Sequence, residues 1–210
     1  MKQQKVTEML ALFQQRYPNP RPALRYTNAF ELLVAVVLSA QCTDERVNRV
    51  TETLFQEYGS PEKMLSLGEE ELGKRIFSCG LYRSKAKHLI ETCRALIETY
   101  GGQVPSTLEE LKTLPGVGVK TANVVYSVQF GGDAIAVDTH VFRVSNRLGL
   151  SNSKTPAACE KDLQRAIPKN QWGKAHHYLI FLGREICSAR KPDCENCFLN
   201  HLCEKKIRKK

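Results

Sequence analysis

Four of the eight cysteines lie close together near the end of the 210-residue chain. They are Cys187, Cys194, Cys197 and Cys203, spaced as C-x6-C-x2-C-x5-C. Thiols this closely spaced in a reducing compartment indicate a metal site rather than disulfides. Structural zinc is one candidate, although zinc sites usually pair two short knuckles and only Cys194 and Cys197 form one. A [4Fe–4S] cluster also takes four cysteines, and the unequal gaps favour this larger group.

Two adjacent cations, Arg190 and Lys191, lie in the gap between the first two of these cysteines. On a loop held by a metal they would make rigid phosphate contacts, and an ordinary solvated charge pair is the alternative. The whole chain has 31 Lys and Arg against 22 Asp and Glu, which gives a net charge of +9. This excess favours a polyanionic partner, with nucleic acid first and an anionic membrane surface as its rival.

A second candidate site is the glycine-rich segment 114–122, which lies between two helical patterns. Pro115 fixes its own φ, and Gly116 and Gly118 permit conformations that are closed to other residues. In so tight a turn the backbone around Val117 can approach an anion, and the next helix adds the positive end of its dipole. The spacing is not that of a P-loop, so a DNA phosphate is favoured over a nucleotide. A plain helix–helix turn is the alternative.

Lys120 directly follows this turn, and Asp138 comes before a later helical pattern. A lysine at a helix start is disfavoured as a cation, so its pKa is expected below the usual value of about 10.4, which favours a nucleophilic amine. The alternative is a solvated lysine that binds phosphate. Asp138 can stabilise positive charge on a sugar or accept a proton, and its alternative role is a helix N-cap.

The elements that must position these residues are predicted to be helical nearly throughout. Apolar residues recur at helical spacing, and we count about eleven short helices and no sheet. Asn28 is expected to cap a buried helix from Ala29 to Ala40, and Asp44 to cap the next helix. The β-rich segments 32–38 and 123–128 lie inside longer helical patterns and are therefore predicted to be buried helix.

The sequence also predicts where the protein acts. The longest apolar run, 32–38, is far shorter than the roughly 18 residues that a membrane span needs. The first residues lack the apolar core of a signal peptide. We therefore expect no membrane association and a cytoplasmic location, associated with the nucleoid if the source is bacterial.

Several of these segments, in this order along the chain, resemble the helix-hairpin-helix DNA glycosylase superfamily. Residues 114–122 resemble its hairpin, and 131–141 resemble the Gly-rich segment with an essential aspartate that follows it. The terminal cysteine spacing is similar to its iron–sulfur motif, and 38–44 resembles a further segment. The similarity is strongest to the bacterial endonuclease III family.

This resemblance implies an all-α fold of two helical domains with a cleft between them. Residues 22–132 would form a six-helix barrel-like domain with the helix-hairpin-helix. Residues 1–21 and 133–210 would form a discontinuous domain with the [4Fe–4S] cluster. Lys120 and Asp138 would be catalytic across the cleft, and the four cysteines of the C-terminal motif would hold the cluster.

The resemblance also implies base excision repair of double-stranded DNA that contains damaged pyrimidines or abasic sites, by a monomer. The enzyme would remove oxidised pyrimidines and cut the strand by β-elimination through a lysine imine. Gln41 and Leu81 would fill the gap left by the flipped base, the alternatives being a surface glutamine and a core leucine. Gly116, Val117, Gly118, Arg190 and Lys191 would also contact DNA. The rival functions are a monofunctional glycosylase and a non-enzymatic DNA-binding protein with a zinc-stapled loop.

Overall fold

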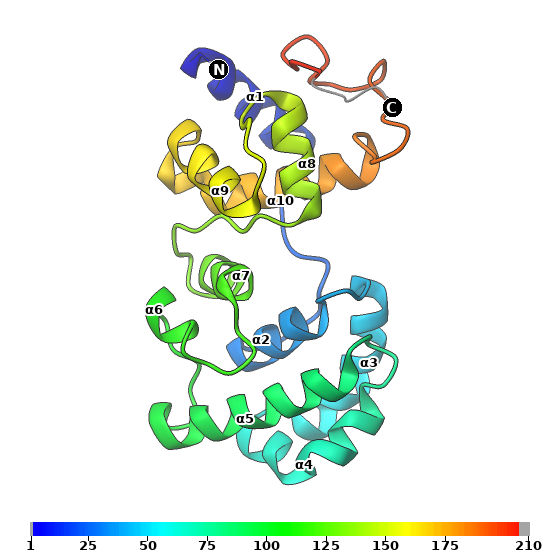
Figure 1. The fold of residues 1–210 in the computed structure, drawn as a ribbon, viewed down its shortest axis with the longest axis vertical. Helices are drawn as coiled ribbons and strands as arrows, with labels where there is room; N and C mark the ends of the chain where they lie inside the picture. The colour runs from blue at the N-terminus through cyan, green and yellow to red at the C-terminus, as the bar shows by residue number, and fades with distance from the viewer. Residues whose placement is uncertain (1, 206–210) are drawn as a thin grey trace. The chain divides into compact units, whose positions relative to one another are not determined.

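The computed structural model describes residues 2–205, and in this range it has ten α-helices, one 3₁₀ helix and no strand (Figure 1). The predicted all-α fold is therefore confirmed. Within the same residues no helix is both long and apolar enough to cross a membrane. The helices are α1 (Gln3–Arg16), α2 (Ala29–Leu38), α3 (Asp44–Tyr58), α4 (Pro61–Arg75), α5 (Tyr82–Tyr100), α6 (Leu108–Leu111), α7 (Val119–Gln129), α8 (Thr139–Leu148), α9 (Pro156–Ala166), η1 (Lys169–Gln171) and α10 (Trp172–Glu185).

The described chain divides into two compact units. One unit is residues 23–131 and holds α2 to α7. The other combines the residues before 23 with those after 131, so that α1 belongs with α8, α9, η1 and α10. The functional assignments of the predicted domains stay predictions.

Helix α2 forms the centre of the unit 23–131. Its residues from Phe30 to Leu38 are all buried, and it packs against α3, α5 and α7. Two reciprocal hydrogen bonds cap the start of α2. Asn28 Oδ1 accepts a hydrogen bond from the Glu31 amide, and Glu31 Oε2 accepts one from the Thr27 amide at 2.6 Å. This pair of caps offsets the cost of burying the first turn. The prediction of a buried helix for the β-rich segment 32–38 is confirmed.

Two helix boundaries differ from the sequence-based expectation by one or two residues. The N-cap of α3 is Thr43, whose Oγ1 accepts the amide of Arg46, whereas the expected cap Asp44 is the first helical residue. Both residue types favour helix starts, and the extended backbone of Thr43 decides between them. Helix α2 ends at Leu38 instead of Ala40.

The second unit is built around an aromatic stack that joins α1 to α10. The rings of Phe13 and Tyr178 lie 5.2 Å apart and nearly parallel, and Tyr178 donates its hydroxyl to Gln14 Oε1 at 2.7 Å. Tyr17 donates its hydroxyl to Glu185 at 2.8 Å. Stacking together with satisfied hydroxyl groups explains why the first helix packs with the last part of the chain.

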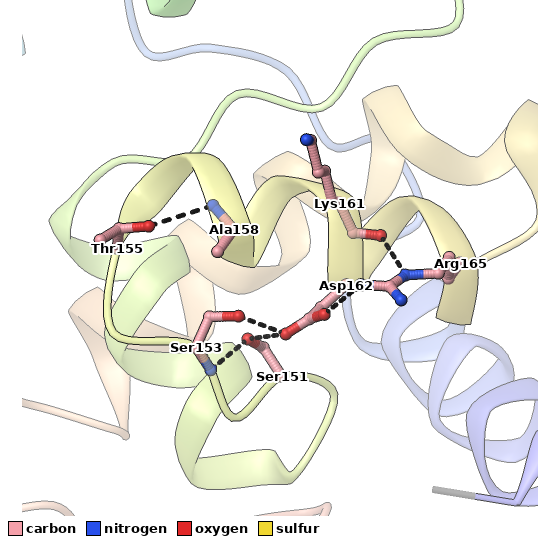
Figure 2. A network of polar contacts seen from close by, with 7 residues as sticks. All are labelled: Ser151, Ser153, Thr155, Ala158, Lys161, Asp162 and Arg165. Atoms are coloured by element: carbon pink, nitrogen blue, oxygen red, sulfur yellow. Dashed lines mark hydrogen bonds and ion pairs between the residues drawn. The ribbon is translucent and has the colours of Figure 1, made fainter.

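A polar network fastens the loop between α8 and α9 (Figure 2). Asp162 accepts hydrogen bonds from the hydroxyls of Ser151 and Ser153 and from Arg165. The serine hydrogen bonds hold the pKa of the Asp162 carboxyl below its usual value. Thr155 then caps α9 by accepting the amide of Ala158. These hydrogen bonds tie the loop to the start and middle of α9, and none of the residues involved is a predicted site residue.

Candidate functional site

The hairpin between α6 and α7 is a turn that requires glycine at one position. Gly116 has φ +72°, and a Cβ there would lie 2.6 Å from His88 Cβ. Thr92 on α5 donates its hydroxyl to Pro115 O at 2.7 Å. The hairpin is therefore held against α5 by a close backbone approach and one side-chain hydrogen bond.

The other glycine of the hairpin does not need its special freedom. Gly118 has φ −80° and ψ 173°, which any residue can adopt, and a Cβ would meet no atom of the described chain within 4 Å. Glycine permits a special conformation at both positions, and only Gly116 of the two adopts one. Val117 is 5% exposed, and its amide donates to Leu114 O at 3.1 Å. Its side chain therefore shapes the turn from within the core.

Lys120 is the second residue of α7, and its side chain is exposed. Its neighbour Val119 is also exposed, at 54%. Within residues 2–205 no side chain caps the start of α7, where the N-cap is Gly118. The first-turn amides and the lysine ammonium are thus presented together, an arrangement suited to a phosphate or another anion.

Asp138 lies in the second unit and is the N-cap of α8. Its Oδ1 accepts the amide of Val141 at 2.7 Å, and the residue is half-buried. The chain before it, 134–137, is buried, and His176 on α10 lies 2.8 Å from Ala136 O through Nδ1. The capping role that the sequence offers as an alternative is therefore real, and it uses one of the two carboxylate oxygens.

Gln41 and Leu81 lie on two turns that the fold brings together. A Cβ on Gly80 would lie 3.6 Å from Gln41 O. Both residues are exposed, Leu81 at 61%, so Leu81 is not the core leucine of the alternative interpretation. Both have left-handed backbone, with φ 55° and 59°, which is costly for residues with a Cβ. Nothing in the residue types at these positions predicts this conformation.

The four cysteines of the C-terminal motif line one pocket. Its wall also contains the apolar side chains of Leu148, Leu182 and Ile186. The described part of the chain contains no group of three or more His, Cys, Asp or Glu placed for a single metal ion, whereas the four thiols surround one space. Soft thiolate donors around an apolar-walled space fit an iron–sulfur cluster.

Polar groups around this pocket are aimed at the sulfurs. The amide of Lys205 donates to Cys203 Sγ at 3.3 Å, and Arg147 Nη1 lies 3.4 Å from Cys187 Sγ. Donors of this kind stabilise thiolates that ligate a metal. Asn200 lines the same pocket, and its Oδ1 is buried without a partner in residues 2–205. The amide oxygen and nitrogen exchange places when the group rotates, so this side chain can supply an N–H donor there.

The loop that carries the exposed Arg190 and Lys191 is held by an arginine that the sequence reasoning missed. Arg147 on α8 donates to Ser188 O at 2.7 Å and to Ala189 O at 2.9 Å. Arg143, one turn earlier on the helix, donates to Cys187 O. The only sequence signal is a pair of arginines four residues apart, which does not reveal carbonyl partners more than forty residues away.

The fold and these features define a class of protein, an all-helical protein with a helix-hairpin-helix turn and a four-cysteine iron–sulfur loop in one chain. The chain belongs to the HhH-GPD superfamily of base excision DNA repair proteins, whose family model matches residues 34–169. The model of the iron–sulfur binding domain of endonuclease III matches residues 187–203.

Curated relatives and solved structures agree with this membership. The chain is 54% identical to endonuclease III of Bacillus subtilis, over 89% of this chain and 86% of the relative. It is 50% identical to endonuclease III of Rickettsia conorii, over 97% of both. It is similar to the structure of a trapped endonuclease III–DNA covalent intermediate, with a TM-score of 0.92 and 48% identity over 98% of this chain and 97% of that chain.

The family and these similarities confirm three of the predictions. The chain is a DNA repair enzyme of the DNA glycosylase and AP lyase class, and it has the [4Fe–4S] cluster of the endonuclease III family.

Proposed function

We propose that this chain excises oxidised pyrimidines from double-stranded DNA and then cuts the abasic strand on its 3′ side. It acts as a monomer in the cytoplasm, and on the nucleoid if its source is bacterial. The observation that carries the proposal is the exposed Lys120 amine on the first turn after the hairpin. A structural relative of this chain has been trapped as a covalent intermediate with DNA, which is the product expected of such an amine.

The proposed chemistry begins with the damaged nucleotide flipped out of the duplex, because its glycosidic bond is inaccessible in the stack. The Lys120 amine attacks C1′ of the deoxyribose, and the C1′–N bond breaks with its electron pair leaving on the base, which gains a proton. The carboxylate of Asp138 stabilises the positive charge that develops on the sugar and accepts a proton from the attacking amine.

The covalent adduct then becomes the substrate of the lyase step. The sugar ring opens, and nitrogen and C1′ form an imine that acidifies the protons on C2′. Loss of one C2′ proton forms the C2′–C3′ double bond as the C3′–O bond breaks, and the 3′ phosphate leaves with that electron pair. Water then hydrolyses the imine and returns the Lys120 amine.

The remaining predicted residues would hold the DNA. Gln41 and Leu81 fill the space left by the flipped base, while the amides around Gly116 and Gly118 bind a phosphate. For Val117 we propose a packing role in the turn, because its side chain is buried and its amide is used. The cluster is held by Cys187, Cys194, Cys197 and Cys203. It cross-links the loop, so that Arg190 and Lys191 contact the phosphate backbone of the DNA at fixed positions.

Borohydride trapping on an abasic duplex tests the nucleophile. The native protein should form a covalent adduct, and Lys120→Ala should form none while it still binds the duplex. Lys112→Ala is the matched control, because Lys112 is an exposed lysine on the same hairpin with no proposed role. An adduct with Lys120→Ala would assign the chemistry to another amine.

The same experiment separates the rival functions. Base release without any adduct from the native protein would indicate a monofunctional glycosylase. Binding without base release would indicate a DNA-binding protein. Duplexes with an oxidised pyrimidine, an oxidised purine or no damage then test the lesion class, and faster release of the purine would contradict the proposed specificity.

A further inference from the structure

Lys85 is a buried lysine that the proposed chemistry does not use. It lies on the first turn of α5 and is 5% exposed. Its ammonium donates to three backbone carbonyls, Leu38 O at 2.9 Å, Ala40 O at 2.7 Å and Cys79 O at 3.4 Å. A buried ammonium is costly unless its hydrogen bonds are made, and here each of its three protons has an acceptor.

Two of these carbonyls belong to the turns that carry Gln41 and Leu81, and the third belongs to the end of α2. Ala40 directly precedes Gln41, and Cys79 lies two residues before Leu81. Leu38 is the last residue of α2, whose C-terminal carbonyls favour a nearby cation. One side chain therefore ties the end of a helix to both turns, across 47 residues of sequence on one side and 6 on the other.

The same two turns contain the non-glycine residues of this unit that adopt a left-handed backbone conformation. Among residues 2–205, Gln41, Leu81 and Lys205 are the non-glycine residues with positive φ. Left-handed backbone at a non-glycine residue persists where the surroundings fix it, and it is concentrated at functional sites. Two of these three residues lie one and two positions from carbonyls that Lys85 holds.

The groups that shift the pKa of Lys85 are two thiols, and no carboxylate is among them. Burial lowers the pKa of Lys85, while the nearby thiols of Cys79 and Cys42 raise it. Burial also raises the pKa of Cys79 to about 11, so that thiol stays neutral at physiological pH. The carbonyl dipoles are then the main partners of the ammonium.

We propose that Lys85 is a positioning residue that locks the Gln41 and Leu81 turns into one rigid wedge, which enters the duplex when the base leaves it. The inference rests on the proposed function, because it assigns the two exposed side chains to the space opened by the flipped base. Filling that space needs two side chains at a fixed separation, and loops that must be ordered on binding lose affinity to that ordering. Lys85 orders them beforehand.

The test compares strand cutting on two substrates with the same abasic site, one a duplex and one a single strand. A single strand has no opposite base and no stack to hold open, so its cutting needs the nucleophile but not the wedge. Lys85→Met keeps an unbranched side chain that ends one atom short of the ammonium, and it removes the donors. We expect duplex cutting to fall by about tenfold or more, with single-strand cutting within about twofold of native.

Lys87→Met is the control on the same helix, since Lys87 is exposed and lies 4.0 Å from Glu91. It should change neither rate. If Lys85→Met does not fold, Lys85→Gln, a shorter polar side chain that reaches fewer carbonyls, must lower the same duplex-to-single-strand ratio. Equal losses on both substrates, or no loss on either, would overturn the inference.

A further measurement distinguishes positioning from general weakening. Leu81→Ala should lower the duplex-to-single-strand ratio, and adding Lys85→Met should lower it by much less than the two separate effects combined, because both act through one wedge. Independent effects would contradict the inference. If the native protein fails to form the borohydride adduct, the proposed function fails instead, so the two failures are distinguishable.

Discussion

Two regions of the unit 23–131 present residues to DNA in the proposed function, and they are built in different ways. The hairpin before Lys120 takes its shape mainly from its own sequence, from Pro115 and a glycine at φ +72°, and one hydrogen bond from Thr92 holds it against α5. The turns that carry Gln41 and Leu81 contain ordinary residues in left-handed conformations, and a lysine from α5 holds them.

In this comparison one lysine supplies the proposed nucleophile, and a different lysine positions the loops. Lys120 is exposed at a helix start, where an amine is accessible to substrate. Lys85 is buried with all its protons engaged, so it cannot act as a nucleophile but can define the shape of two loops. A turn that owes its shape to glycine is local, whereas a turn held by a remote cation depends on the whole unit.

The largest effect should come from the exposed lysine. Lys120→Ala removes the proposed nucleophile, so cutting should fall by about a thousandfold or more on the duplex and on the single strand alike. The midpoint of thermal unfolding should stay close to native, because an exposed side chain contributes little to stability. If Lys120→Ala still cut the single strand, Lys120 would not differ from Lys85 in the way proposed, and it would not be the nucleophile.

Asp138 is a position where support and chemistry coincide, and two substitutions separate them. Asn is as good an N-cap as Asp, so Asp138→Asn should keep the free energy of unfolding while base release falls by about 10² or more. Asp138→Ala should lose the same activity and also about 1 kcal/mol of stability. Denaturant unfolding and single-turnover base release measure the two effects, and an active Asp138→Asn would leave only the capping role.

The third effect tests whether the hairpin is as local as its geometry suggests. Gly116→Ala places a Cβ against His88 in a left-handed conformation, and we expect a loss of about 1–3 kcal/mol in unfolding free energy together with weaker duplex binding. Gly118→Ala is the control, since its backbone is extended and its Cβ meets open space. A larger loss from Gly118→Ala than from Gly116→Ala would contradict this account.

The local features of this molecule were predictable from sequence and the remote ones were not. The cysteine spacing, the hairpin and the Asn28 cap are complete within short segments, so residue types at known distances define them. Glycine permits a left-handed φ without requiring it, so the sequence alone does not show that Gly116 adopts one and Gly118 does not.

The remote supports depend on contacts that spacing does not encode. Lys85 and Arg147 donate to backbone carbonyls, and any residue type supplies a carbonyl. Their partners are also up to 47 and 42 residues away in sequence. The left-handed residues Gln41 and Leu81 lie next to carbonyls that Lys85 binds, and their residue types predicted a role through family resemblance but not a conformation.

The smallest effect concerns the backbone of the paired turns. At a left-handed position glycine avoids the steric cost of a Cβ, so Leu81→Gly should be more stable than Leu81→Ala by about 0.5–1 kcal/mol. At Ser84, an exposed position on α5, the order should reverse, with Ser84→Ala more stable than Ser84→Gly by about 1 kcal/mol. Chemical denaturation of the four variants measures both differences.

Duplex cutting by the same Leu81 variants tests why a leucine occupies this left-handed position. Both Leu81 variants should lose duplex cutting to a similar extent, because each lacks the side chain that fills the gap. Suppose that Leu81→Gly is more stable than Leu81→Ala and equally inactive. The leucine side chain is then needed for activity, although its left-handed backbone lowers the stability of the protein. If the glycine variant is the less stable of the two, the left-handed conformation is not a cost at this position, and Lys85 has less strain to hold than the geometry implies.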